Sequence, residues 1–350
     1  MRCSCVARAL AAVSAIALFA GCGGASPSAA PPAAPQNRSP RQVPTGECPC
    51  LYVADSDSNA VTVYATGATG NAKPIQNIHG ASTGLDNPRG VAVDSDGKMY
   101  VVNDSSNTSL DSITVYAAGA TGNAAPVQTI LGSNTQLDEP AGIALNPVNG
   151  DIYVLNYTNV SGNGSITFYP QNANGNVKAS GAIQGSSTML YASYGIALDA
   201  SGNIYNSNGP AQNSVTVFAA GSTGNVPPSW TIQGSQTRLD DSVGLALDSS
   251  ANVYVTNYKQ PLPKSAFAVT VYPAGSSGDV APTQDLMGSR TKLNEPSGIA
   301  VDGSGNVYVA NWDTNAITVY APGATGNLAP SRTIKGKATK LSGPFGIAIR

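Results

Sequence analysis

The sequence predicts an all-β fold, namely a six-bladed β-propeller whose blades have four strands each. The first observation behind this prediction is a unit of roughly 50 residues that recurs six times after residue 50. Each unit holds four short stretches of β-branched and aromatic residues, separated by Gly, Asn and Asp turns and without a helical period. The chain also ends on a copy of the stretch that the first unit lacks, so its two ends together complete one blade.

The composition excludes several classes of function. Asp, Glu, Lys and Arg make up 11% of the 350 residues, against about 25% in an ordinary soluble domain. With 18 basic and 20 acidic residues, the chain lacks the basic surface that captures nucleic acid, so we expect no nucleic-acid partner. Because the chain has a single His, catalysis by histidine is a poor hypothesis.

Residues 1–21 have the features of a lipoprotein signal peptide. Arg2 and Arg8 flank the start of an apolar run, Leu10–Ala20, which is shorter than the roughly 20 residues of a transmembrane helix. The run ends in Leu-Phe-Ala-Gly before Cys22, which resembles the lipobox of bacterial lipoproteins. This resemblance implies lipidation of Cys22, whereas an ordinary signal peptide with an incidental Cys is the alternative. We therefore expect secretion across the inner membrane and a lipid anchor in the cell envelope, in the outer membrane facing the periplasm or the cell surface, as the only membrane contact.

A tether separates the lipidation site from the predicted propeller. Residues 22–46 are rich in Pro, Ala and Ser and have no hydrophobic period, which indicates an extended linker. Residues 47–350 then form the propeller domain and begin with a Cys-Pro-Cys sequence, Cys48 and Cys50. In an oxidising compartment this pair forms a local disulfide or remains as two thiols, with a redox role as a further alternative; two Cys alone cannot complete a zinc site.

Three columns of residues recur in the repeat. The first stretch reads Gly-Ile-Ala-Val-Asp or a variant, anchored at Gly90, Gly142, Gly195, Gly244, Gly298 and Gly346. The second stretch carries a tyrosine in every unit: Tyr52, Tyr100, Tyr153, Tyr205, Tyr254 and Tyr308. The third reads Thr-Val-Tyr-Ala or a variant, starting at Thr62, Thr114, Thr167, Thr216, Thr270 and Thr318. The first unit begins at Leu51 with its second stretch, and Phe345–Ile349 supply the missing first one.

The sequence from Gly298 to Asn311, Gly-Ile-Ala-Val-Asp-Gly-Ser-Gly-Asn-Val-Tyr-Val-Ala-Asn, resembles the NHL repeat. The wider group includes gluconolactonase-like and virginiamycin B lyase-like six-bladed propellers. The resemblance extends over residues 51–350 and implies the fold. It does not imply an activity, since these propellers include lactonases, lyases, receptors and scaffolds.

Comparison of the six units separates the framework from a candidate binding face. The turns after the first and third stretches are nearly invariant, which indicates structural roles. The loops before the first stretch and after the second one vary, and they share one face of a propeller. Aromatic and amide side chains on or beside them suit a neutral ligand, although packing at the rim is the alternative. The candidate ligand-binding residues are Tyr157, Tyr258, Trp312, Asn103, Asn257 and Asn311.

The same face carries the only candidate metal ligands. In gluconolactonase-like propellers, carboxylates and Asn hold a divalent metal at the channel mouth, and Glu139, Glu295 and Asp241 offer such oxygens for Ca²⁺ or Mg²⁺ here. Glu139 and Glu295 belong to the third and sixth units, which face each other across a six-bladed ring. Asn103, Asn257 and Asn311 belong to a further column, which ends the second stretch of every unit and also includes Asp55, Asn156 and Asn208. Recurrence in every unit favours a structural role for this Asn column, as side chains that cap strand ends. The family's lyases use His near the metal, but His79 falls in an outer strand, far from the mouth.

The sequence therefore predicts a lipid-anchored, extracytoplasmic propeller that binds a ligand through its variable face without catalysis. An envelope protein or a glycan is the expected partner, and we expect a monomer. The alternative is a metal-dependent hydrolase of the lactonase type. No catalytic residue and no certain cofactor emerge from the sequence.

Overall fold

The computed structural model describes residues 49–157, 164–210, 212–258 and 267–350. They belong to a compact unit, Pro44–Arg350. The predicted signal peptide (1–21), the predicted tether (22–46), Cys22 and Cys48 lie outside the described residues.

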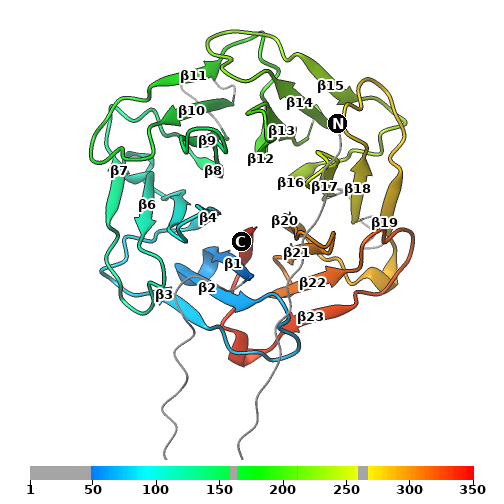
Figure 1. The fold of residues 1–350 in the computed structure, drawn as a ribbon, viewed down its shortest axis with the longest axis horizontal. Coiled ribbons are helices and arrows are strands. Elements are labelled where there is room, and N and C mark those ends of the chain that lie inside the picture. Colours follow the sequence, from blue (N-terminus) through cyan, green and yellow to red (C-terminus); the bar gives the residue numbers. More distant parts are fainter. Residues whose placement is uncertain (1–48, 158–163, 211, 259–266) are drawn as a thin grey trace, which may run out of the picture. The chain divides into compact units, whose positions relative to one another are not determined.

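Six four-stranded antiparallel sheets form the blades of a propeller, which we number I to VI along the chain (Figure 1). The inner strands, from blade I to blade VI, are β24 (Pro344–Ile349), β4 (Pro88–Val93), β8 (Pro140–Leu145), β12 (Ser193–Leu198), β16 (Ser242–Leu247) and β20 (Pro296–Val301). The second strands are β1 (Cys50–Asp55), β5 (Met99–Asn103), β9 (Ile152–Asn156), β13 (Ile204–Asn208), β17 (Val253–Asn257) and β21 (Val307–Asn311).

Two further strands complete each blade. The third strands are β2 (Ala60–Ala65), β6 (Ser112–Tyr116), β10 (Ser165–Tyr169), β14 (Ser214–Phe218), β18 (Ala268–Tyr272) and β22 (Ala316–Tyr320). The outer strands are β3 (Gln76–His79), β7 (Gln128–Leu131), β11 (Gly181–Gln184), β15 (Trp230–Gln233), β19 (Gln284–Met287) and β23 (Arg332–Lys335). Short 3₁₀ helices connect some of them: η1 (Ser56–Ser58), η2 (Thr108–Leu110), η4 (Ser289–Thr291) and η5 (Lys337–Thr339). None of the helices in the described ranges is long and apolar enough to span a membrane.

Closure of the ring occurs as the sequence predicts. The C-terminal strand β24 pairs with β1, and Tyr52 lies opposite Ala348 in this pairing. Each inner strand also contacts the inner strands of both neighbouring blades, including β20 with β24 and β24 with β4. The six blades therefore form a continuous ring with no open side.

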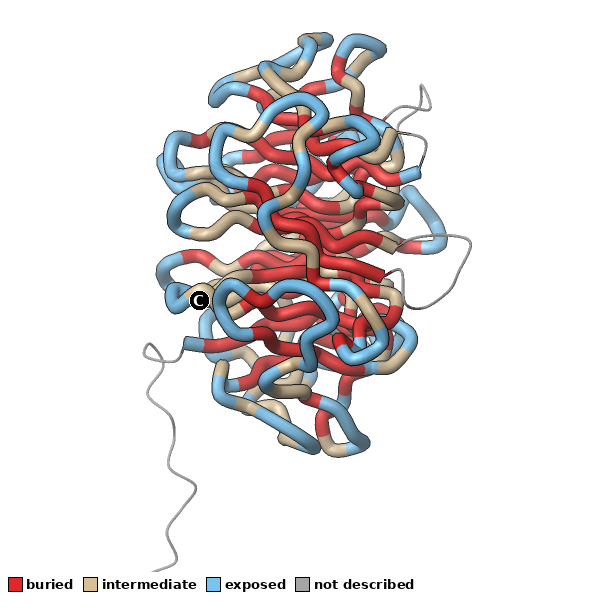
Figure 2. Tube along the Cα trace, turned by 90° about the vertical axis from the view of Figure 1, so that its right-hand side faces the viewer, coloured by how far each residue is buried: buried red, intermediate tan, exposed pale blue. Residues whose placement is uncertain are grey.

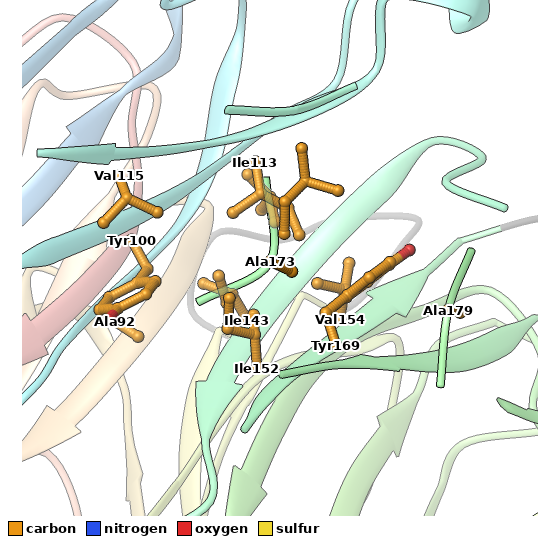
Figure 3. Close-up of a cluster of buried hydrophobic side chains, with 12 residues drawn as sticks. Ala92, Tyr100, Ile113, Val115, Ile143, Ile152, Val154, Tyr169, Ala173 and Ala179 are labelled. Carbon is orange, nitrogen blue, oxygen red and sulfur yellow. The ribbon is translucent and has the colours of Figure 1, made fainter. Parts of the chain in front are cut away.

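The hydrophobic core lies between blades, because each sheet buries both of its faces. Figure 3 shows one such cluster, in which Tyr100 and Val115 of blade II and Ile143 and Val154 of blade III are buried together. The described residues form six clusters of this kind, one at each junction of neighbouring blades. Figure 2 shows the result, with buried strands inside and exposed turns at both edges. This arrangement explains why the second and third strands are apolar on both faces.

The repeated residues of the inner strands and tyrosine columns form the framework. A Cβ atom added to Gly298 would overlap the carbonyl oxygen of Phe345 in the next blade, and one added to Gly346 would overlap that of Arg89. Glycine is therefore needed because the inner strands approach one another closely. The hydroxyl groups of the third-strand tyrosines bond to the lead-in loops of their own blades; for example, Tyr116 donates to the carbonyl oxygen of Thr83 at 2.7 Å.

The turn residue after the inner strand has the structural role that its recurrence predicts. In blade IV, Oδ1 of Asp199 accepts hydrogen bonds from the backbone N–H groups of Ser201 and Asn203, both at 2.9 Å. His79 ends the outer strand β3, as expected, and its side chain is exposed. Cys50 is disulfide-bonded, while the other cysteines lie outside the described residues.

Candidate functional site

The candidate site is at one end of the central channel. Two loops of each blade meet there: the lead loop, which precedes the inner strand, and the loop between the second and third strands. We call this end the mouth face. The second residue of each inner strand lines the channel, and it differs in every blade: Phe345, Arg89, Ala141, Tyr194, Val243 and Ser297. The channel cavity measures only about 60 Å³, so a ligand larger than a few waters must lie over the mouth.

Aromatic side chains from opposite blades meet across this channel. The rings of Tyr194, in blade IV, and Phe345, in blade I, have centroids 6.2 Å apart. Tyr157, on the mouth-face loop of blade III, packs on Tyr194 at 4.9 Å. Burial raises the pKa of Tyr194, and its hydrogen bond with Tyr157 acts in the same direction. These three rings form an aromatic floor below the mouth.

One arginine lies against this floor. The guanidinium of Arg89 is 4.8 Å from the ring centroid of Phe345, and its Nε donates to Oδ2 of Asp104 at 3.1 Å. Asn87 also donates to Asp104, through its side-chain amide. Burial raises the pKa of the Asp104 carboxyl, and Arg89 partly counteracts this effect. Among the described residues that line the channel, Arg89 is the one cation, and it is already paired beside aromatic surface.

The sequence did not identify Arg89, Tyr194 or Phe345. Their common signal is the position directly before the anchor glycine, which varies while the glycine recurs. A residue that varies beside a recurring glycine can be assigned to the channel lining once the direction of the inner strand is known.

The predicted aromatic and acidic residues lie in pairs on neighbouring loops. The backbone N–H groups of Tyr157 and Trp312 donate to the carbonyl oxygens of Glu139 and Glu295, at 3.0 and 3.1 Å. In blade V, the N–H group of Tyr258 bonds in the same way to Asp241, at 3.0 Å. The same backbone hydrogen bond thus joins each loop that carries a predicted aromatic residue to the lead loop that carries a predicted acidic residue.

Two of these pairs are linked by side chains. The hydroxyl group of Tyr258 donates to Oε1 of Glu295 at 3.0 Å, across the junction of blades V and VI. The ring of Tyr258 also packs on Phe267, at 5.6 Å between centroids. Trp312 has 41% of its surface exposed and is the most accessible of the three predicted aromatic residues, since Tyr157 and Tyr258 are partly buried. It is therefore available to a ligand on the mouth face.

The predicted asparagines have a different environment. Asn103, Asn257 and Asn311 are at most 1% exposed. Each side-chain oxygen accepts a backbone N–H bond from the lead loop, and each amide donates to a threonine of the third strand, as Asn103 does to Thr114 at 3.1 Å. These amides hold the lead loop against the blade, so the structural alternative for this column fits the geometry and direct ligand contact does not.

The three candidate metal ligands come from three different lead loops. No group of three or more His, Cys, Asp or Glu side chains within the described ranges could hold a metal ion. Glu295 instead accepts the bond from Tyr258. Burial, with the nearby Asp240 as a smaller cause, raises the pKa of Asp241 to about 6. These residues do not form a ligand set for Ca²⁺ or Mg²⁺ in this arrangement, so the metal site remains a prediction from the sequence.

Comparison with known proteins agrees with the fold. A family model described as the NHL repeat matches residues 293–320. These residues are therefore similar to the NHL repeat. The matched segment runs from the lead loop of blade VI to the end of its third strand, and it therefore includes Glu295 and Trp312. No curated protein matches the sequence.

Solved structures resemble this propeller in fold. A "putative 6-phosphogluconolactonase" from Bacteroides uniformis has a TM-score of 0.58 at 14% identity, with 86% of this chain and 99% of that chain covered. A protein of unknown function from Bacteroides caccae also has a TM-score of 0.58, at 10% identity and with 87% and 99% covered. Hydrazine synthase from Kuenenia stuttgartiensis has a TM-score of 0.53 at 17% identity, with 82% and 80% covered. At these identities, the similarity concerns the fold alone.

Proposed function

We propose that this propeller is a non-catalytic binding module whose mouth face contacts a segment of an envelope protein or a glycan. One observation carries the proposal: the channel-lining position differs in all six blades although the surrounding framework repeats. A purely structural ring has no need of six different side chains at one position. A single bound ligand contacts each blade differently, and it therefore favours a different side chain in each blade.

The chemistry of the mouth supports a polymer lying across it. The channel is too small to enclose a ligand, whereas Tyr157, Tyr194 and Phe345 offer adjacent ring surfaces. Aromatic side chains bind sugar faces and apolar peptide side chains at little cost in conformational entropy. Trp312 adds an exposed ring at the rim.

The proposed location follows from the N-terminal sequence. Lipidation of Cys22 would attach the chain to a membrane of the cell envelope, and residues 23–46 would give the propeller reach. Metabolic labelling with a palmitate analogue tests this step. Incorporation that is lost in Cys22→Ala supports the anchor, and equal incorporation in both chains contradicts it.

Binding at the mouth is tested by affinity capture from envelope extract and by a glycan array. We expect Tyr157→Ala and Trp312→Ala to weaken capture at least about fivefold, because each removes a ring from the contact surface. Val148→Ala is the control, since Val148 is 71% exposed and lies in the turn between β8 and β9, on the opposite face. Capture that is unchanged by both ring substitutions would contradict a binding site at the mouth.

The hydrolase alternative makes a different prediction. It requires lactone hydrolysis that depends on Ca²⁺ or Mg²⁺ and on Glu139, Asp241 and Glu295. Lactone hydrolysis by the wild-type protein that is lost in the Glu139→Gln/Glu295→Gln variant would replace the binding proposal with the enzymatic one.

A further inference from the structure

A second cavity lies on the same face as the mouth but away from the channel, against the outer part of blade VI. It has a volume of about 390 Å³, which is within the usual size of a small-molecule site, roughly 300–1,000 Å³. One wall is the lead loop 288–294, and the other is formed by the third and outer strands β22 and β23. Lys292 contributes from the loop, and Lys335 and Thr333 from the outer strand.

Comparison with blade V, whose outer strand carries the carboxylate Asp285 at the position of Thr333, shows that the cations of this cavity lack a matching acid. In blade V, Arg238 of the lead loop forms an ion pair with Asp285 of the outer strand. The corresponding residues of blade VI are Lys292 and Thr333, so the carboxylate is missing. Neither Lys292 nor Lys335 has an ion-pair partner among the described residues. Two ammonium groups therefore line one cavity without the acid that the equivalent position supplies in blade V.

A second substitution removes another acid from the same wall. Asn294 lies at the lead-loop position that Asp240 occupies in blade V. It is 7% exposed, and its amide donates to Oδ2 of Asp313 at 2.6 Å. Its Oδ1 is buried and has no hydrogen-bond partner within the described part of the chain. An unpaired buried acceptor costs free energy, which a donor reaching this wall would recover.

We propose that this cavity binds a small acidic sugar, with the anionic group at Lys292 and Lys335. Ammonium groups form charge-assisted hydrogen bonds with carboxylate or phosphate oxygens. The remaining lining is rich in groups that pair with sugar hydroxyls, namely Ser289, Thr314 and Thr333 together with Asn294. The site belongs to blade VI and does not depend on the proposed function of the mouth.

The test is calorimetric titration of the purified full-length chain in detergent with three probes. Glucuronate carries both the charge and the hydroxyls, inorganic phosphate carries charge alone, and glucose carries hydroxyls alone. We expect glucuronate to bind more tightly than either other probe and to weaken as salt is raised. Equal affinities for glucuronate and phosphate would overturn the assignment of a sugar, and the absence of heat with glucuronate at millimolar concentrations would overturn the site.

Variants taken from blade V locate the binding. Thr333→Asp restores the carboxylate found at Asp285, so it should pair with Lys292 and abolish glucuronate binding. Lys335→Met copies Met287 of blade V and should weaken binding about tenfold, since one charge-assisted hydrogen bond is lost. Lys340→Gln is the control, because Lys340 has the same lead-loop position in blade I. Glucuronate affinity that survives Thr333→Asp and Lys335→Met, in variants with wild-type melting temperature, would contradict the proposal.

Discussion

In blade I, the hydroxyl group of Thr62 donates to Oδ2 of Asp55 at 2.6 Å. The other five blades have Asn at the position of Asp55, and there the side-chain amide donates to the threonine, as Asn311 does to Thr318 at 3.0 Å. The carboxyl of Asp55 is fully buried. Burial raises its pKa to about 8, although hydrogen bonds from Thr62 and from the backbone of Ser342 oppose the shift. Blade I therefore contains a carboxyl whose charged form is disfavoured by the fold.

The substitution Asp55→Asn should stabilise the protein near neutral pH. Because the pKa of Asp55 is raised in the folded state, its contribution to stability is greatest below the unfolded value, about 4, and is lost as the pH rises towards 8. The amide has no charge to desolvate and can bond as in the other blades. We expect a gain of roughly 2–4 kcal/mol at pH 8 and almost none at pH 4, measured by denaturant unfolding at both pH values.

The reciprocal substitution is the matched control. Asn103→Asp places a carboxyl in the equivalent buried position of blade II. Its stability should fall as the pH rises over the same range, whereas that of Asp55→Asn should not. If the stability of both variants varies with pH as that of the wild-type protein does, a charged carboxyl is tolerated at these buried positions. That result would contradict this account.

The channel glycines should tolerate no side chain. A methyl group at Gly298 would overlap the carbonyl oxygen of Phe345, so Gly298→Ala must move two inner strands apart. We expect a loss of at least about 2 kcal/mol in unfolding free energy. Gly303→Ala is the control, because nothing lies within 4 Å of its added Cβ. Equal melting temperatures for the two variants would show that the ring relaxes freely.

The predicted aromatic residues should separate into one with a structural role and one without. Tyr258→Phe removes the hydroxyl that bonds to Glu295 and should cost about 1 kcal/mol. Trp312→Ala should change stability by less than about 0.5 kcal/mol, since the side chain is 41% exposed. Differential scanning calorimetry of the two variants measures both effects. A larger loss for Trp312→Ala would place Trp312 in the framework and remove it from the binding surface.

The fold was predictable because its determinants repeat. Anchor glycines and tyrosines recur at fixed intervals, and Phe345–Ile349 visibly complete the first unit. The site was predictable only in part, because it depends on what does not repeat. Arg89 and Tyr194 can be recognised as site residues only after the inner strands are known to enclose a channel. The cavity of blade VI likewise depends on contacts between a loop and a strand that are separated by about 40 residues.

The paired arginine at the mouth allows a prediction about charge. Arg89 and Asp104 have side chains 27% and 21% exposed, and burial already raises the pKa of Asp104. Arg89→Gln removes the cation that lowers this pKa, so the folded-state pKa rises further. The resulting loss of stability, about 1 kcal/mol, should grow as the pH rises above 4 and disappear in acid, where Asp104 is protonated in both states. The double variant Arg89→Gln/Asp104→Asn should lose this pH dependence, because no charge remains unpaired. If the single and double variants have the same profile between pH 4 and pH 8, the ion pair makes no contribution, and the role of Arg89 lies in its contact with Phe345 alone.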